Sequence, residues 1–180
     1  DNRLYNKNKP FDYRDFRRHF NFMLKQNYYL LSREWNYKNI KPKIFAEKVF
    51  EKENLVDYRF FCFNGEVKLI LVDIDTCAKD GKHAPDAKRN IYDRNYNLLD
   101  FTIGRPSYDP SLAPKPLNYE LMVKYAEVLS KPFKFVRVDF YNFNGEIFFG
   151  EITFYPGGTI QQISDDKWDE KLGSWIDIET

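Results

Sequence analysis

The sequence predicts an α+β domain in which about three helices pack against a mostly antiparallel sheet. The tetrapeptide Phe-Asn-Gly-Glu occurs at residues 63–66 and again at 143–146, each time between two apolar segments. Asn-Gly in that setting is the strongest short signal for a β-hairpin. Aromatic residues form 18% of the chain, which suits the packing of a sheet. A chain of 180 residues can hold one domain with a substantial core, so we treat residues 1–180 as a single domain.

The first half of the chain begins with a helix and continues with strands. Asp12 can cap a helix, and Phe16, Phe20 and Met23 recur behind it at helical spacing. Apolar segments bounded by polar residues predict the strands that follow, while a polar segment with Gly81 and Pro85 predicts a loop. The expected elements are a helix over 12–27, a strand over 43–50, a hairpin of 57–63 with 66–75, a loop over 76–89 and a short hairpin over 91–101.

The second half of the chain contains two further helices around the second Asn-Gly hairpin. Residues 118–129 are amphipathic and predict a helix, and Lys131-Pro132 ends it. Ser164 is expected to cap a closing helix that turns Trp168, Leu172 and Trp175 inward. The residues expected on the inner side of the earlier helix are Leu121, Tyr125, Val128 and Leu129.

Charge and composition exclude several classes of protein. A net charge of +1 gives no general attraction to nucleic acid, so we expect no nucleic-acid partner. No apolar run approaches the length that spans a membrane. Two cysteines, Cys62 and Cys77, cannot form a disulfide framework, and a reducing cytoplasm is therefore the expected location.

Ionisable residues interrupt two apolar strands near the second Asn-Gly pair. Arg137 and Asp139 share one face of their strand, and Glu151 and Thr153 share a face of the next. A two-residue turn would put Asp139 and Glu151 on opposite faces. A three-residue loop of residues 143–145 would place Arg137 opposite Glu151, with Asp139 on the same face. The second register permits a metal site, whereas an ordinary cross-strand ion pair on a wet face is the alternative.

The turn after the acidic strand strengthens the metal-site interpretation. Tyr155-Pro156-Gly157-Gly158 follows directly, and a glycine-rich turn allows a ligand or phosphate to approach the backbone closely.

These motifs resemble a known family. Arg-Val-Asp-Phe at 137–140, a hairpin, and Glu-Ile-x-x-x-Pro-Gly at 151–157 resemble the magnesium site of ATP-grasp ligases, the D-alanine–D-alanine ligase type among them. Longer runs resemble the TupA-like branch, which acts in teichuronopeptide and surface-polysaccharide biosynthesis. The resemblance covers about residues 36–175, and the runs that carry it are 37–42, 57–65, 92–101 and 171–175.

The resemblance implies an ATP-grasp fold that uses ATP and Mg²⁺. The implied activity is a carboxylate–amine ligase, in which ATP converts a small-molecule or glycan carboxylate to an acyl phosphate and an amine then forms the amide. Thr153 stands where related ligases usually have Asn. The resemblance implies that magnesium is bound by Asp139, Glu151 and Thr153, and that Arg137 contacts the transferring phosphoryl group. It implies that the adenine is bound by Glu47, Lys48 and Val49, the ribose by Asp57 and a phosphate by Arg89. The acceptor substrate is expected to lie near Gly157 and Gly158.

The glycine-rich phosphate loop of the family is not found in this chain, whose first glycine is Gly65. We therefore expect the chain to be the C-terminal portion of the fold, with residues 1–35 as a helical lead-in and 36–180 as the nucleotide- and metal-binding sheet. Two other hypotheses stay open: a glycosyl- or phosphoryl-transferase of the same pathway, and a non-catalytic half-domain.

Overall fold

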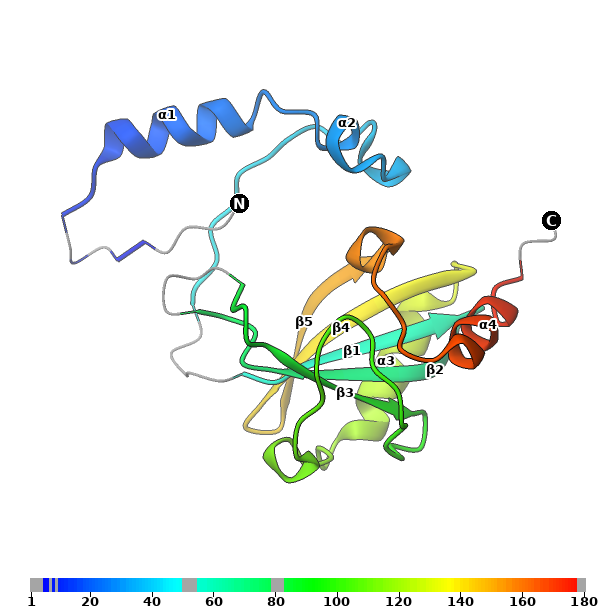
Figure 1. The fold of residues 1–180 in the computed structure, drawn as a ribbon. Coiled ribbons are helices and arrows are strands. Elements are labelled where there is room, and N and C mark those ends of the chain that lie inside the picture. The colour runs from blue at the N-terminus through cyan, green and yellow to red at the C-terminus, as the bar shows by residue number, and fades with distance from the viewer. Residues whose placement is uncertain (1–4, 7, 9, 50–54, 79–82, 178–180) are drawn as a thin grey trace. The chain divides into compact units, whose positions relative to one another are not determined.

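A five-stranded antiparallel sheet is the centre of the C-terminal part of the chain in this computed structural model, with strand order β3-β2-β1-β4-β5 (Figure 1). The structure describes residues 5, 6, 8, 10–49, 55–78 and 83–177. It divides into two units, Asp1–Lys52 and Glu53–Thr180, each described here by itself. The strands are β1 (Asp57–Phe63), β2 (Glu66–Ile74), β3 (Lys88–Asp93), β4 (Phe135–Phe143) and β5 (Glu146–Thr153). The α+β class and the antiparallel sheet are confirmed.

Both Asn-Gly pairs form the predicted hairpin turns. Asn64 and Gly65 have φ values of 52° and 80°, and Asn144 and Gly145 have 53° and 81°. Positive φ at both central residues is the mark of a two-residue type I′ turn. Phe143 therefore pairs directly with Glu146, and the three-residue loop that the metal-site interpretation required does not form.

A β-bulge nevertheless brings the predicted site residues to one face. Phe140 pairs with Phe149, but Val138 pairs with Ile152, so β5 holds one residue more than β4 between these pairs. Beyond the extra residue, the side chains of β5 that had pointed to one face of the sheet point to the other face. Arg137 consequently lies opposite Thr153 rather than opposite Glu151. The β1–β2 hairpin contains a similar irregularity between Phe61 and Cys62.

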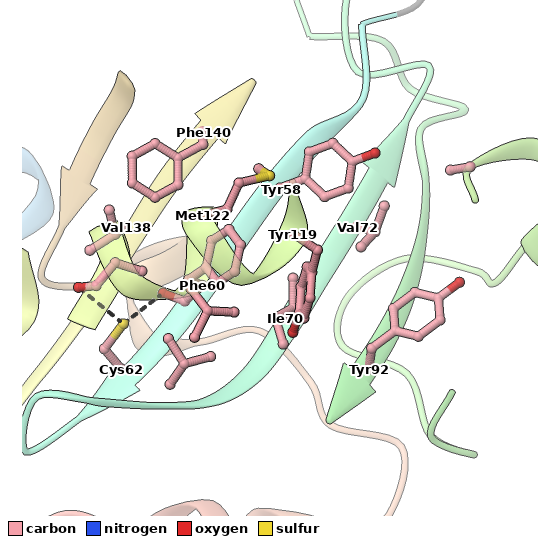
Figure 2. Close-up of a cluster of buried hydrophobic side chains, with 14 of the residues drawn as sticks. Tyr58, Phe60, Cys62, Ile70, Val72, Tyr92, Tyr119, Met122, Val138 and Phe140 are labelled. Carbon is pink, nitrogen blue, oxygen red and sulfur yellow. Dashed lines mark hydrogen bonds between the residues drawn. The ribbon is translucent and has the colours of Figure 1, made fainter. Parts of the chain in front are cut away.

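Each face of the sheet has its own apolar core. Helix α3 (Tyr119–Ser130) covers one face, and Tyr119 and Met122 pack there against β1, β2 and β4 (Figure 2). Cys62 is buried in this core. On the opposite face, Leu172 of α4 (Asp166–Ser174) packs with Trp168 and Trp175 against one end of the sheet. The predicted inward face of the closing helix is thus confirmed, although its cap is Asp165 rather than Ser164.

The inward face predicted for α3 is wrong. The helix buries Tyr119, Met122, Val123, Ala126 and Ser130, whereas all four residues that were expected inside are exposed. Apolar residues cover more than half of the helix circumference, so the periodicity of the sequence does not determine which side of α3 faces the sheet.

The expected hairpin over 91–101 is reduced to β3, a turn and a single bridge between Tyr92 and Leu98. Two short 3₁₀ helices, η2 (Pro110–Leu112) and η3 (Pro156–Thr159), lie between the longer elements.

The N-terminal unit consists of short helices. They are α1 (Tyr13–Met23), α2 (Tyr28–Ser32) and the 3₁₀ helix η1 (Trp35–Tyr37). Asp12 caps α1 as predicted, because its side chain accepts from the backbone N–H groups of Arg14 and Asp15. The expected strand over 43–50 is wrong for residues 43–49, and Phe50 lies outside the described residues. A strand is stable only when its backbone groups find a partner strand, and the described part of this unit offers none.

Candidate functional site

Arg137 joins three of the predicted site residues on one face of β4 and β5. Its Nε donates to Oδ1 of Asp139 at 2.7 Å, and its Nη2 donates to Oδ2 of the same carboxylate at 2.8 Å. Nη2 also donates to Oγ1 of Thr153 at 3.0 Å and to Oε1 of Glu151. The Thr153 hydroxyl lies 3.0 Å from Oε1 of Glu151 and can donate to it. The structure therefore places Arg137, Asp139, Glu151 and Thr153 together.

A second ionic cluster lies on the same face, around Asp73 of β2. Asp73 is fully buried, and both of its oxygens accept from Arg89, at 2.6 and 2.7 Å. Arg105 donates to the same carboxylate at 2.8 Å, and Nε of Arg59 lies 3.1 Å from Oδ2. One carboxylate thus faces three guanidinium groups.

Arg59 connects the two clusters. It lies directly opposite Asp139 in the β1–β4 pairing, and its Nε is 3.9 Å from Oδ2 of that residue. Its Nη2 donates to Asp57 at 3.4 Å. Burial alone would lower the pKa of Arg59, but Asp73, Asp57 and Asp139 together hold it above its ordinary value. We call the whole set the charged face; it consists of Asp57, Arg59, Asp73, Arg89, Arg105, Arg137, Asp139 and Glu151.

Asp139 and Glu151, two carboxyl groups of the charged face, differ in burial. Burial raises the pKa of Asp139 to about 6, from an ordinary 3.8, and the neighbouring Arg137 and Arg59 only partly oppose this rise. Glu151 differs because its side chain is 60% exposed. The two carboxylates therefore have unlike environments: one is fixed by protein groups, and the other is open to solvent.

The chemistry of these oxygen atoms fits magnesium. Mg²⁺ prefers oxygen ligands, and it commonly binds through one or two carboxylates together with phosphates. Asp139, Glu151 and Thr153 supply such a set, whereas no group of three or more acidic, His or Cys side chains able to hold a metal occurs in the described part of the chain. Arg137 lies among these oxygens, so an ion bound here would share the carboxylates with the guanidinium.

Two other predicted residues belong to the charged face in different ways. Asp57 is buried on β1 and reaches the site through Arg59. Arg89, expected at the phosphates, is buried in β3, where Nη1 donates to the carbonyl of Ile103 at 3.0 Å and the other two nitrogens hold Asp73. Protein groups thus surround this guanidinium on three sides, which suits a residue that positions its neighbours.

The glycine pair follows β5 in η3 as a left-handed turn. Gly157 and Gly158 have φ values of 59° and 65°, in the left-handed region that favours glycine. The N–H of Gly158 donates to the carbonyl of Tyr155 at 3.0 Å, so this amide closes the turn rather than pointing to a ligand.

The residues expected at the adenine belong to the N-terminal unit. Glu47, Lys48 and Val49 are exposed and lie in an irregular segment. The charged face belongs entirely to the other unit. Their role at the adenine stays a prediction.

Sequence reasoning missed Arg59, Asp73 and Arg105. For the first two a signal exists, because Asp57 and Arg59 alternate with apolar residues in β1, and Asp73 sits in the otherwise apolar segment of β2. Charged residues at alternate positions of an apolar strand share one face of the sheet, and the same rule predicts that Arg137 and Asp139 share a face. Arg105 lies in a loop and carries no such signal.

A shallow depression of about 550 Å³ lies apart from the charged face. It is lined by Gly65, Glu66, Val67, Lys68, Asp93, Arg94, Asn95 and Glu127. None of the predicted site residues contributes to it. We place the candidate site on the charged face because buried, mutually bonded charges are found there, and buried charge is costly unless it is paired.

A family model described as TupA-like ATPgrasp matches residues 2–177 of the chain. No curated protein and no solved structure matches the chain. None of the described helices is long and apolar enough to traverse a lipid bilayer.

Proposed function

Because the chain belongs to the TupA-like ATPgrasp family, and hence to the ATP-grasp superfamily, we propose that it acts as an ATP-dependent carboxylate–amine ligase in the biosynthesis of a cell-surface polysaccharide or teichuronopeptide. The observation that supports this proposal is the cluster of Arg137, Asp139, Glu151 and Thr153 on one face of β4 and β5. The substrates would be a small-molecule or glycan carboxylate and an amine. ATP consumption and the free cysteines favour the cytoplasm.

In this proposal Asp139, Glu151 and Thr153 would hold Mg²⁺, which neutralises phosphate charge when it is bound. Arg137 would stabilise the transferring phosphoryl group and then the acyl phosphate, because its planar fork offers several N–H donors at once. Asp139 fixes that fork through two bonds, at 2.7 and 2.8 Å. Arg59 and Asp57 would support Asp139 from β1, while Asp73, which is itself held by Arg89, would hold Arg59 in place.

The proposal is tested by ATP turnover with a panel of sugar acids and amino acids. Asp139→Asn and Glu151→Gln remove a charged ligand at nearly constant size, so each should lower ADP release by roughly a hundredfold or more. Arg137→Lys should be comparably damaging because lysine cannot form the planar fork. Glu146→Gln is the matched control, since this exposed carboxylate lies on the same strand but near the turn.

Product analysis separates the ligase from a transferase. Amide formation together with ADP and phosphate is expected for the ligase, whereas a glycosyl- or phosphoryl-transferase would leave the amine unmodified. Site variants that melt like the wild type and still turn over ATP normally would show that these residues form a structural ion-pair set. The proposal would then be withdrawn.

A further inference from the structure

Helix α3 carries a second apolar face that points away from the sheet. Leu121, Tyr125 and Val128 are 41%, 43% and 63% exposed, although they follow one another at helical spacing. Leu129 extends the same side and is also exposed. We call these four residues the outer stripe. A contiguous apolar strip of this kind on a surface indicates that something binds there.

Charged residues of alternating sign run along one edge of the outer stripe. In sequence order they are Glu120, Lys124, Glu127 and Lys131. Their spacing of three to four residues keeps them on one side of the helix. Arg94 contacts Glu120 at 3.2 Å and Glu127 at 3.7 Å, and Lys115 contacts Glu120 at 3.5 Å, yet the side chains of Glu120 and Glu127 stay 65% and 33% exposed. The edge can therefore still meet an outside partner.

The order of these charges is self-complementary. If two copies of α3 lie antiparallel about a two-fold axis near Tyr125, the same edge of each helix meets its own copy. Lys124 then lies beside Glu127 of the second copy, and Glu120 lies beside Lys131 of the second copy. The same arrangement sets Leu121 against Val128 and Leu129 of the other helix, and sets the two Tyr125 rings against each other.

We propose that α3 forms a two-fold symmetric contact between two copies of this chain, through the outer stripe. Contacts with this symmetry use the same patch on both copies, which is the commonest arrangement in homo-oligomers. The outer stripe provides the apolar centre, and the alternating charges fix the antiparallel direction. Because α3 covers the face of the sheet opposite to Asp139 and Arg137, the dimer leaves the charged face open.

Sedimentation velocity over a range of protein concentrations tests the dimer. We expect a reversible monomer–dimer equilibrium in the wild type. Leu121→Glu and Val128→Glu bury a charge in the contact, so each should raise the dimer dissociation constant by roughly tenfold or more. Ile160→Glu is the control, because Ile160 is exposed but lies outside α3, and this variant should dimerise like the wild type.

A cross-linking experiment tests the geometry without a destabilising charge. Cys77 is exposed and is first replaced by Ser, while Cys62 is buried. Tyr125→Cys should then form a disulfide-linked dimer under mild oxidation, because two copies of this position face each other. Ile160→Cys should not. A wild type that is monomeric at every concentration would overturn the proposal. So would a dimer that survives Leu121→Glu, or a Tyr125→Cys protein that fails to cross-link.

Discussion

Asp139 and Arg137 show how a single pair of residues can be both costly and useful. Asp139 has lost most of its contact with water, which penalises its charged form. Arg137 repays part of that cost through two hydrogen bonds, and Arg59 contributes from the adjacent strand. In the proposed magnesium site, a carboxylate that is held this firmly would bind the cation without further ordering.

The raised pKa of Asp139 predicts a specific dependence of stability on pH. Its folded-state pKa of about 6 exceeds the ordinary 3.8, so between these values the folded protein keeps a proton that the unfolded chain has released. The associated stability is present at low pH and is lost as the pH rises through about 6, on the order of 3 kcal/mol in total.

Two measurements check this prediction. Carboxyl-carbon NMR should give Asp139 a titration midpoint near 6. Denaturant unfolding at low and neutral pH should show that Asp139→Asn loses this pH-dependent component. A midpoint close to 4 would contradict the prediction and would mean that Arg137 and Arg59 fully offset the effect of burial on the pKa of Asp139.

Among the secondary-structure elements, the β4–β5 hairpin determines whether Asp139 and Glu151 can lie on one face of the sheet, as the proposed magnesium site requires. Its two-residue turn alone would have separated Asp139 from Glu151, and the bulge brings them to one face. The hairpin itself could be predicted from Asn-Gly, because that pair has a strong local preference. The bulge could not, since it depends on how β4 and β5 fit their neighbours. The inner face of α3 was missed because the helix has two apolar sides.

Gly150 lies at this bulge and gives a test of its importance. A methyl group there would come within 3.1 Å of the carbonyl oxygen of Asp139 and 3.4 Å of the Tyr141 ring. Gly150→Ala should therefore displace the β4 backbone at Asp139 and lower ATP turnover more than it lowers thermal stability. Gly173→Ala, in α4 and next to open space, should leave turnover unchanged. Equal turnover in both variants would show that the bulge tolerates the shift.

For the molecule as a whole, the charged face links strands that are distant in sequence. Three arginines meet at the carboxylate of Asp73 in β2: Arg89 from β3, Arg59 from β1 and Arg105 from a loop. Only the assembled sheet brings these residues together. Sequence reasoning reached Asp139 and Glu151 because both lie on one hairpin, but it could not connect them with Asp73, which is 66 residues from Asp139 along the chain.

Asp73→Asn should destabilise the whole C-terminal unit. The change leaves the buried Arg89 and the partly buried Arg59 and Arg105 without their shared carboxylate, and breaking buried ion pairs in this way typically costs about 3 to 5 kcal/mol. Denaturant unfolding measures the effect. The matched control is Glu66→Gln, which removes an exposed ion pair with Lys68 and should change stability little. A similarly small effect of Asp73→Asn would show that the Asp73 cluster adds nothing to stability.

The most direct test of the central claim is paramagnetic broadening of NMR signals by Mn²⁺ with ATP, in which Mn²⁺ takes the place of Mg²⁺. We predict that the amide signals of Asp139, Glu151 and Thr153 broaden first, while those of α3 on the opposite face stay sharp. Glu151→Gln should weaken the effect. Broadening centred elsewhere in the chain, or broadening that is unchanged by Glu151→Gln, would contradict a metal–nucleotide site on the charged face.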